Sequence, residues 1–261
     1  MKYLILSFHL LILFNLQAQV TFVAAHRGQA SSAPENSMRG IKNLLPTGIK
    51  YIEIDIRTSK DSILVIMHDA SLKRTTKCPS QTNELTFKEL KQLTMVGGKK
   101  KDRIPSLSEV CNILKNWNDI NTKRQVNLYV DCKDAHPKQL IETLLHYGLL
   151  DNAVFYAKDS YLLELRKLHP TIKIIAALKK TDDLDNKITE LRPFAFDVPF
   201  PILTKELVDK IHGHRIEVFS DLLFNFDNHT TYKQAKAMNV NVIQTDRANK
   251  ALHALKVFKA Q

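Results

Sequence analysis

The sequence has few of the residues that build a disulfide framework or a zinc site. It contains only three cysteines, Cys78, Cys111 and Cys132, and no two of them have the close spacing of a zinc-binding pair. An odd, sparse set excludes a small disulfide-stabilised fold, so we expect mainly buried thiols with at most one bridge. No cysteine lies near the N-terminal apolar run, and nothing indicates a lipid-modified N-terminus.

The sequence also lacks an apolar run that is long enough to span a membrane. Residues 1–18 begin with a positive charge at Lys2, continue with an apolar run and end in the small residue Ala18. This run is shorter than the roughly 20 residues of a spanning helix, and the pattern is typical of a secretory signal peptide. We predict cleavage after Ala18 and a secreted or periplasmic mature domain at residues 19–261. A membrane anchor is the alternative.

Acidic residues are outnumbered by basic ones, which gives a formal net charge of +11. This surplus attracts phosphates, anionic lipid surfaces and nucleic acids alike, and it does not select among them. The sequence has no zinc-finger spacing and no basic helix followed by heptads, so we expect no nucleic-acid partner. Transient contact with a membrane lipid surface stays open, and the sequence sets no oligomeric state.

Short β-branched runs alternate with amphipathic stretches along the chain, without internal repeats or low-complexity tracts. This rhythm is typical of βα units, and 261 residues suit one (β/α)₈ barrel. We therefore predict an α/β fold of the TIM-type barrel class. The eight expected strands are residues 21–25, 51–57, 126–130, 153–157, 172–177, 194–198, 216–220 and 240–245.

A ninth apolar run, residues 63–67, follows the second expected strand too closely for a parallel crossover, so it should return antiparallel. A turn centred near Lys60 would place His68 alongside Ile52 and Glu53. The polar segment at about residues 70–105 is then a small insertion after the return strand, with a short helix around 87–93.

Charged side chains gather where the expected strands end. The active sites of parallel barrels lie at the carboxyl ends of the strands, so residues there are candidates for chemistry. The candidates are His26 and Arg27, Glu53 and Asp55, His68 and Asp69, and Asp131 and Lys133.

Glu53 and Asp55 are two residues apart and point to the same face of their strand. Asp131 ends the next parallel strand, and three carboxylates with room for water suit Ca²⁺ or Mg²⁺ better than Zn²⁺. We predict a divalent-cation site with these three ligands. The alternative is a structural ion network in which the carboxylates pair with Arg27 and Lys133.

His26 and His68 each end a strand beside a charged neighbour. An imidazole titrates near neutral pH, so one can act as a general base and the other as a general acid. Arg27 and Lys133 could hold phosphoryl oxygens. A divalent cation, two proton carriers and two fixed positive charges together indicate phosphate ester cleavage.

The same residues carry a family resemblance. The sequence resembles the glycerophosphodiester phosphodiesterases through an ordered series of motifs: Ala25-His26-Arg27-Gly28, Pro34-Glu35-Asn36-Ser37, Glu53-Ile54-Asp55-Ile56, Thr58-Ser59-Lys60-Asp61, His68-Asp69, Arg74-Thr75-Thr76, Ile104-Pro105-Ser106-Leu107 and Asp131-Cys132-Lys133. The second half of the chain is supported mainly by the βα rhythm and by Thr245-Asp246.

The resemblance implies hydrolysis of a glycerophosphodiester to glycerol phosphate and an alcohol. It makes His26 and His68 the acid and base, the three carboxylates the metal ligands, and Arg27 and Lys133 the phosphate clamps. Glu35, Asn36 and Asp69 would orient these groups. The expected substrate is a small glycerophosphodiester or a lysophospholipid.

Some positions depart from the family pattern. Asp131 stands where Glu is usual, and the seventh strand lacks a frequent Trp-Thr pair, which leaves the substrate alcohol open. Phe200, Phe219, Phe224 and Phe226 are either an apolar wall at the mouth or ordinary packing residues. Two other functions remain as alternatives: a phospholipase D-like or phosphoinositide-specific lyase that forms a cyclic phosphate, and a non-catalytic secreted phosphoester-binding protein.

Overall fold

The computed structural model describes residues 20–30, 33–98 and 100–256 of the chain. The signal peptide predicted at residues 1–18 lies outside the described residues. Within these described ranges, every helix is too short or too polar to cross a bilayer.

Eight parallel strands close into a barrel, which confirms the predicted fold class. The strands follow one another around the ring, and pairing of β1 with β2 closes it. The strands of the ring are β1 (Phe22–Ala25), β2 (Tyr51–Thr58), β4 (Asn127–Cys132), β5 (Val154–Tyr156), β6 (Lys173–Ala177), β7 (Ala195–Asp197), β8 (Glu217–Asp221) and β9 (Val242–Thr245).

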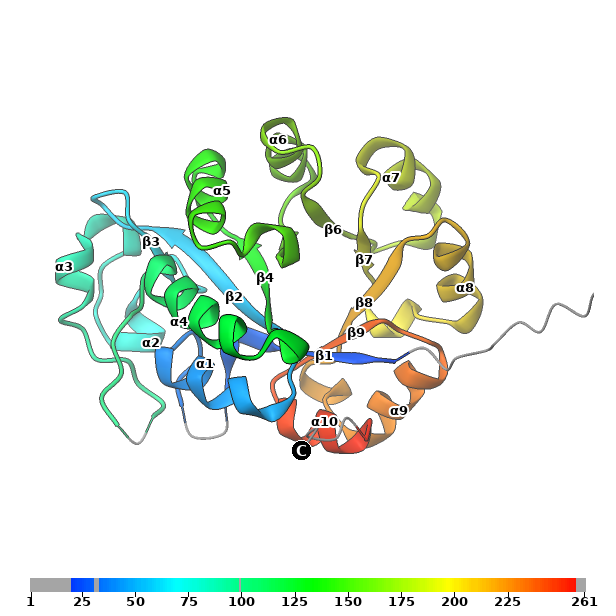
Figure 1. Ribbon diagram of the computed structural model, residues 1–261, viewed down its shortest axis with the longest axis horizontal. Coiled ribbons are helices and arrows are strands. Elements are labelled where there is room, and N and C mark those ends of the chain that lie inside the picture. The colour runs from blue at the N-terminus through cyan, green and yellow to red at the C-terminus, as the bar shows by residue number, and fades with distance from the viewer. Residues whose placement is uncertain (1–19, 31–32, 99, 257–261) are drawn as a thin grey trace, which may run out of the picture.

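Helices connect the strands and form a ring around the barrel (Figure 1). They are α1 (Met38–Leu44), α4 (Leu107–Ile120), α5 (Pro137–His146), α6 (Asp159–Leu168), α7 (Leu184–Leu191), α8 (Lys205–Gly213), α9 (His229–Ala237) and α10 (Ala248–Ala254). Capping residues set several helix starts: Ser106 accepts a hydrogen bond from the Glu109 amide, and Glu109 bonds back to the Ser106 amide. The apolar helix faces pack on the outside of the sheet.

The inside of the barrel is filled by one buried side chain from each parallel strand. These residues are Ala24, Tyr51, Tyr129, Val154, Ile175, Ala195, Phe219 and Val242. Because side chains alternate along a strand, residues two positions farther on also point inward, towards the carboxyl-terminal mouth. Phe219 therefore belongs to the packed interior and not to an apolar wall at the mouth.

The ninth strand, β3 (Leu64–Ile66), returns antiparallel to β2 as predicted. Its register pairs Ile56 with Ile66, so the turn centres on Asp61 instead of Lys60. The Met67 amide donates to the Asp55 carbonyl at 3.0 Å, which places His68 beside Asp55 and not beside Ile52 and Glu53. The predicted register was therefore wrong. The cause is local, because the Ser59 side chain bonds to Asp61 and shapes the turn.

The segment between β3 and α4 contains the short helices α2 (Lys73–Thr76) and α3 (Phe87–Leu90) and lies at one side of the barrel (Figure 1). It has a small core of its own, formed by Val65, Met67, Leu72, Leu90, Met95 and Ile104. The three cysteines are all unpaired, and Cys111 and Cys132 are buried, as expected.

Candidate active site

Three carboxylates meet at the mouth, at the ends of two neighbouring strands. Asp131 of β4 is the direct register partner of Asp55 of β2, and Glu53 lies two residues earlier on the same face. One oxygen from each of the three groups lies within 4.8 Å of the others. Oxygen donors of this kind suit Ca²⁺ or Mg²⁺, so the predicted ligand set fits a divalent cation.

Burial makes this cluster costly without positive charge. Glu53 is 2% exposed and Asp55 is 1% exposed. Burial raises the pKa of Glu53 well above its usual value, and the carboxylates of Asp55 and Asp131 raise it further. Burial likewise raises the pKa of Asp131. A bound cation would relieve both effects, because it favours the ionised carboxylates.

The cations expected to hold phosphate lie against the same carboxylates. Lys133 Nζ is 2.5 Å from Asp131 Oδ2 and 3.1 Å from Asp55 Oδ1, and Arg27 Nε is 3.9 Å from Asp55 Oδ2. The ion network that was the alternative to a metal site is therefore present in the structure. The two interpretations are compatible, since a divalent ion and a phosphate would give the carboxylates and the two cations new partners.

His26 follows β1 and lies in a turn of 3₁₀ helix, His26–Gly28. Its Nδ1 is 2.7 Å from Asp246 Oδ1, at the end of β9. Arg27 Nε donates to His26 Nε2 at 3.2 Å. A carboxylate accepts and an arginine donates, so Nδ1 carries the proton and Nε2 keeps its lone pair. The bond from His26 lowers the pKa of Asp246.

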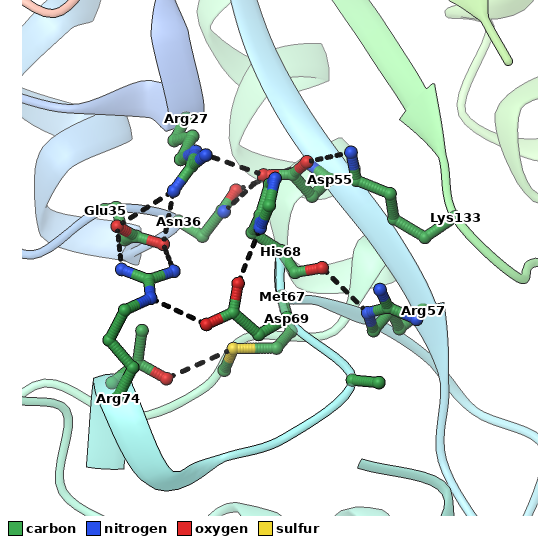
Figure 2. A network of polar contacts seen from close by, with 12 residues as sticks. Arg27, Glu35, Asn36, Asp55, Arg57, Met67, His68, Asp69, Arg74 and Lys133 are labelled. Carbon is green, nitrogen blue, oxygen red and sulfur yellow. Dashed lines mark hydrogen bonds and ion pairs between the residues drawn. The ribbon is translucent and has the colours of Figure 1, made fainter. Parts of the chain in front are cut away.

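His68 has the same kind of support from a neighbouring carboxylate. Its Nδ1 is 2.6 Å from Asp69 Oδ1, and Arg74 Nε donates to Asp69 Oδ2 at 2.6 Å. The bond from Arg74 lowers the pKa of Asp69 to about 2. Arg57 donates from Nε to the His68 carbonyl at 2.8 Å. Figure 2 shows His68 between Asp69 and Asp55.

Glu35 links the two halves of this network. Both of its oxygens accept from Arg74 at 2.7 Å, and Arg27 Nη1 lies 3.2 and 3.3 Å from them (Figure 2). Asn36 donates from Nδ2 to Asp55 Oδ2 at 2.7 Å, which orients that carboxylate. Arg27 and Asn36 both have positive φ, 52° and 53°. Such angles are uncommon outside glycine, and here they turn both side chains towards the mouth.

The structure brings all ten predicted site residues into one region. Three further residues went unassigned in the sequence analysis: Asp246 beside His26, Arg74 beside Asp69, and Arg57 under His68. Asp246 directly follows an expected strand, so the carboxyl-end rule could have found it. Arg57 ends the expected strand 51–57, so the same rule could have found it. Arg74 had only the Arg74-Thr75-Thr76 motif as a signal, because its contacts reach from the insertion to the barrel.

The remaining three phenylalanines lie on loops after β7 and β8. Phe200 packs on Phe226 with ring centroids 5.2 Å apart. Phe224 is 87% exposed and has a φ of 54°. The described structure thus places aromatic rings on these loops, although Phe219 is not among them.

The arrangement combines an acidic cluster that fits a cation, two imidazoles each with one nitrogen fixed by a carboxylate, and two cations that can face a phosphoryl group. On a TIM barrel, these features define an enzyme of the phosphodiesterase class. The sequence profile of the Glycerophosphoryl diester phosphodiesterase family matches residues 26–250. The chain belongs to this family.

Named relatives agree with this assignment. A glycerophosphodiester phosphodiesterase of Caldanaerobacter subterraneus is 30% identical over 162 residues, which cover 59% of this chain and 65% of the relative, just under two thirds of its length. A glycerophosphodiester phosphodiesterase of Bacillus altitudinis is 24% identical over 89% of this chain and 97% of the relative.

Solved structures support the fold. A phosphodiesterase of Oleispira antarctica, solved in complex with the product sn-glycerol-3-phosphate, superposes with a TM-score of 0.78 at 21% identity. The match covers 91% of this chain and 97% of that chain. At this identity the likeness establishes a shared barrel.

Proposed function

We propose that this protein is a divalent-cation-dependent glycerophosphodiester phosphodiesterase in which His26 and His68 transfer protons. One observation carries the proposal: two imidazoles, each oriented through Nδ1 by its own carboxylate, accompany a buried three-carboxylate cluster. A structural ion network has no need of two such histidines. The named relatives and the product held by the Oleispira antarctica enzyme support a glycerol phosphate ester as substrate.

The proton-transfer roles follow from the bonds of each ring. The bond to Asp246 keeps the proton of His26 on Nδ1, so Nε2 carries the lone pair, which would take a proton from the attacking hydroxyl once Arg27 turns to the phosphoryl group. His68 is held by Asp69, whose negative charge supports an imidazolium, so His68 would give a proton to the departing alcohol oxygen. The attacking hydroxyl would be the one beside the phosphate on the substrate glycerol: it bonds to phosphorus as the alcohol leaves, which gives a cyclic phosphate. Water would then open this ring, with His68 as the base and His26 as the acid.

Arg27 and Lys133 would bind phosphoryl oxygens after leaving part of their present contacts with Asp55 and Asp131. Glu53, Asp55 and Asp131 would hold the cation. When bound, the cation supplies positive charge that stabilises the negative charge developing on the phosphoryl oxygens. Asn36 would keep Asp55 turned towards the cation, and Glu35 would keep Arg27 in place.

Phosphorus NMR of the purified protein tests the reaction directly. Glycerophosphocholine and glycerophosphoinositol are incubated with the protein, with Ca²⁺, Mg²⁺ or chelator. We expect glycerol phosphate to appear only with a divalent cation. A cyclic phosphate that persists would identify the lyase alternative, and binding without any product would identify the binding-protein alternative.

The ligand role of Glu53 has a separate test. Because Glu53→Gln removes one negative charge from the cluster, we expect the cation concentration for half-maximal activity to rise about tenfold or more. Glu164→Gln on the exposed face of α6 is the control and should leave the titration unchanged. An unaltered cation titration in Glu53→Gln would refute ligation.

We further propose that the mature protein acts outside the cytoplasm, as the pattern of residues 1–18 indicates. N-terminal sequencing of protein from the periplasm and the medium tests this, and a new N-terminus at Gln19 is the expected result. An intact Met1 on cytoplasmic protein would contradict it.

A further inference from the structure

A second pair of carboxylates points into the barrel on the side away from the predicted phosphate-binding residues. Asp197 of β7 lies two residues beyond Ala195, and Asp221 of β8 lies two residues beyond Phe219; both earlier residues face the barrel interior. Gln244 of β9 is the register partner of Asp221. By strand alternation all three side chains point inward near the mouth.

These three side chains lack partners in the described part of the chain. Neither carboxylate makes a hydrogen bond or ion pair with a described residue, and Asp197 Oδ1 and Gln244 Oε1 are buried without a donor. Asp197 is 9% exposed and Gln244 is 6% exposed, while Asp221 is partly exposed. Buried polar atoms are nearly always bonded, so the two buried acceptors without donors, Asp197 Oδ1 and Gln244 Oε1, call for a ligand beside Asp221.

The charges around Asp197 and Asp221 also indicate that these carboxylates bind a ligand. Burial raises the pKa of Asp221 to about 6; the His26 imidazole and the Lys133 ammonium oppose this rise, and Asp131 and Asp246 increase it. Burial also raises the pKa of Asp197, which Asp221 and Asp131 raise further and Lys179 lowers. These cations act from beyond ion-pair distance. The two carboxylates therefore lack a close positive partner among the described residues.

The position of Asp197 and Asp221 relative to the predicted phosphate-binding residues suggests which kind of ligand group they bind. The clamps and carboxylate cluster lie on β1, β2 and β4, whereas β7 and β8 lie across the ring. A phosphodiester bound at the cluster would extend one of its two alcohols across the mouth. Two carboxylates and the unpartnered amide oxygen of Gln244 suit an alcohol that carries hydrogen-bond donors and a positive charge.

Building on the proposed function, we propose that Asp197, Asp221 and Gln244 form a subsite for the ammonium group of the substrate alcohol, so that the enzyme prefers ethanolamine-type glycerophosphodiesters. Asp221 meets the ammonium directly, since it is the more exposed carboxylate. Asp197 adds negative charge behind it, and Gln244 Oε1 accepts a further N–H.

Competition between glycerophosphoethanolamine and glycerophosphoglycerol tests the subsite, because the second substrate has a neutral, hydroxyl-bearing alcohol. We expect kcat/KM to favour the ethanolamine ester about tenfold or more in the wild type, as for a hydrogen bond to a charged group. Asp221→Asn should remove most of this preference, mainly through KM for the ethanolamine ester. Asp183→Asn changes a carboxylate that lines the same pocket as Asp131 and Lys133, and this control should keep the preference.

Two outcomes would overturn the subsite. One is a wild type that treats both esters alike. The other is an equal loss for both esters in Asp221→Asn; if the cation titration also shifts, the pair holds a second metal ion instead.

Binding measured by calorimetry tests the ammonium subsite independently of the proposed reaction. The His68→Asn variant should bind glycerophosphoethanolamine more tightly than glycerophosphoglycerol, and the His68→Asn/Asp221→Asn variant should not. This difference is measurable even if the wild type hydrolyses neither ester. Equal binding of both esters by His68→Asn would reject the subsite on its own.

Discussion

The two sides of the barrel mouth differ in how their charges are satisfied. On the side of β1, β2 and β4, carboxylates, guanidinium groups and imidazoles form one connected network, with Glu35, Asp55 and Asp69 each bonded to at least one partner. On the side of β7 and β8, Asp197 and Asp221 have no partner among the described residues.

This difference separates two tasks that an active site must perform. The connected side holds reactive groups in fixed geometry before a substrate arrives, which lowers the cost of reaching the transition state. The unpaired side keeps acceptors unsatisfied, which costs folding stability, and a ligand can recover that cost on binding. The predictions below test each side of this contrast, beginning with the largest effect.

Removing either imidazole should lower the catalytic activity more than any other change on the connected side. We expect His26→Ala and His68→Ala each to lower kcat by about a hundredfold or more, because each loses a general acid or base. Turnover of glycerophosphodiesters in the presence of cation measures this. His146→Ala on the exposed surface of α5 is the control, and near-wild-type turnover in either active-site variant would contradict the assignment.

Asp246→Asn should have the next largest effect. The amide can donate to His26 Nδ1, so the proton would move to Nε2, where the lone pair is needed. We expect kcat to fall on the order of tenfold to a hundredfold, as for other partners that orient reactive groups, with little change in KM. The pH profile of kcat should also change shape. A fall in thermal stability with an unchanged pH profile would indicate a structural role only.

Arg74→Gln should lower the stability of the folded protein by an amount that depends on pH. Arg74 lowers the pKa of Asp69 to about 2 in the folded protein, whereas an unfolded Asp titrates near 3.9. The stabilising bond is therefore fully present above about pH 4 and is lost as the pH falls through about 2. Urea unfolding should show wild type more stable than Arg74→Gln at pH 7, with a difference that shrinks from pH 4 downward. A constant difference would exclude Asp69 as the cause.

Asp221→Asn should show the smallest effect, and with the opposite sign. The pKa of Asp221 is raised to about 6 when folded, so the ionised group destabilises the fold increasingly as the pH rises from about 4 to about 6. In chelator and without substrate, we expect the variant to be more stable than wild type by about 1–2 kcal/mol at pH 8. At pH 4 the two should be nearly equal. A destabilised variant at pH 8 would mean that Asp221 has a partner.

Much of the barrel could be predicted from sequence because its signals are local. The parallel strands are short apolar runs, most of them with β-branched residues, and each ends close to its expected boundary. Strand alternation also sufficed to group Glu53 with Asp55, and the carboxyl-end rule brought Asp131 beside them. These inferences need only the two-residue period and the direction of the strands.

The parts that the sequence could not predict depend on side-chain contacts between distant segments. The observed hairpin register differs from the predicted one because Ser59 and Asp61 shape the turn. His68 therefore lies two residues farther along β2 than predicted. The sequence left Phe219 open between a wall at the mouth and ordinary packing, and the structure shows that its side chain fills the barrel interior. The bond between Arg74 and Glu35 joins residues 39 apart in the chain, and no periodic pattern in the sequence indicates such a contact.

His68 directly follows β3, which pairs with β2 and adds Leu64 and Ile66 to the main core. The insertion after His68 packs mainly on a small core of its own, which includes Leu72, Leu90 and Met95. Units of this kind open locally at lower free energy than a closed barrel. The insertion can therefore melt by itself, and with it Asp69 and Arg74, which hold the proposed proton carrier His68 in place. On heating, catalytic activity should disappear at a temperature at which circular dichroism still shows an intact barrel, and cooling from there should restore it without refolding of the whole chain.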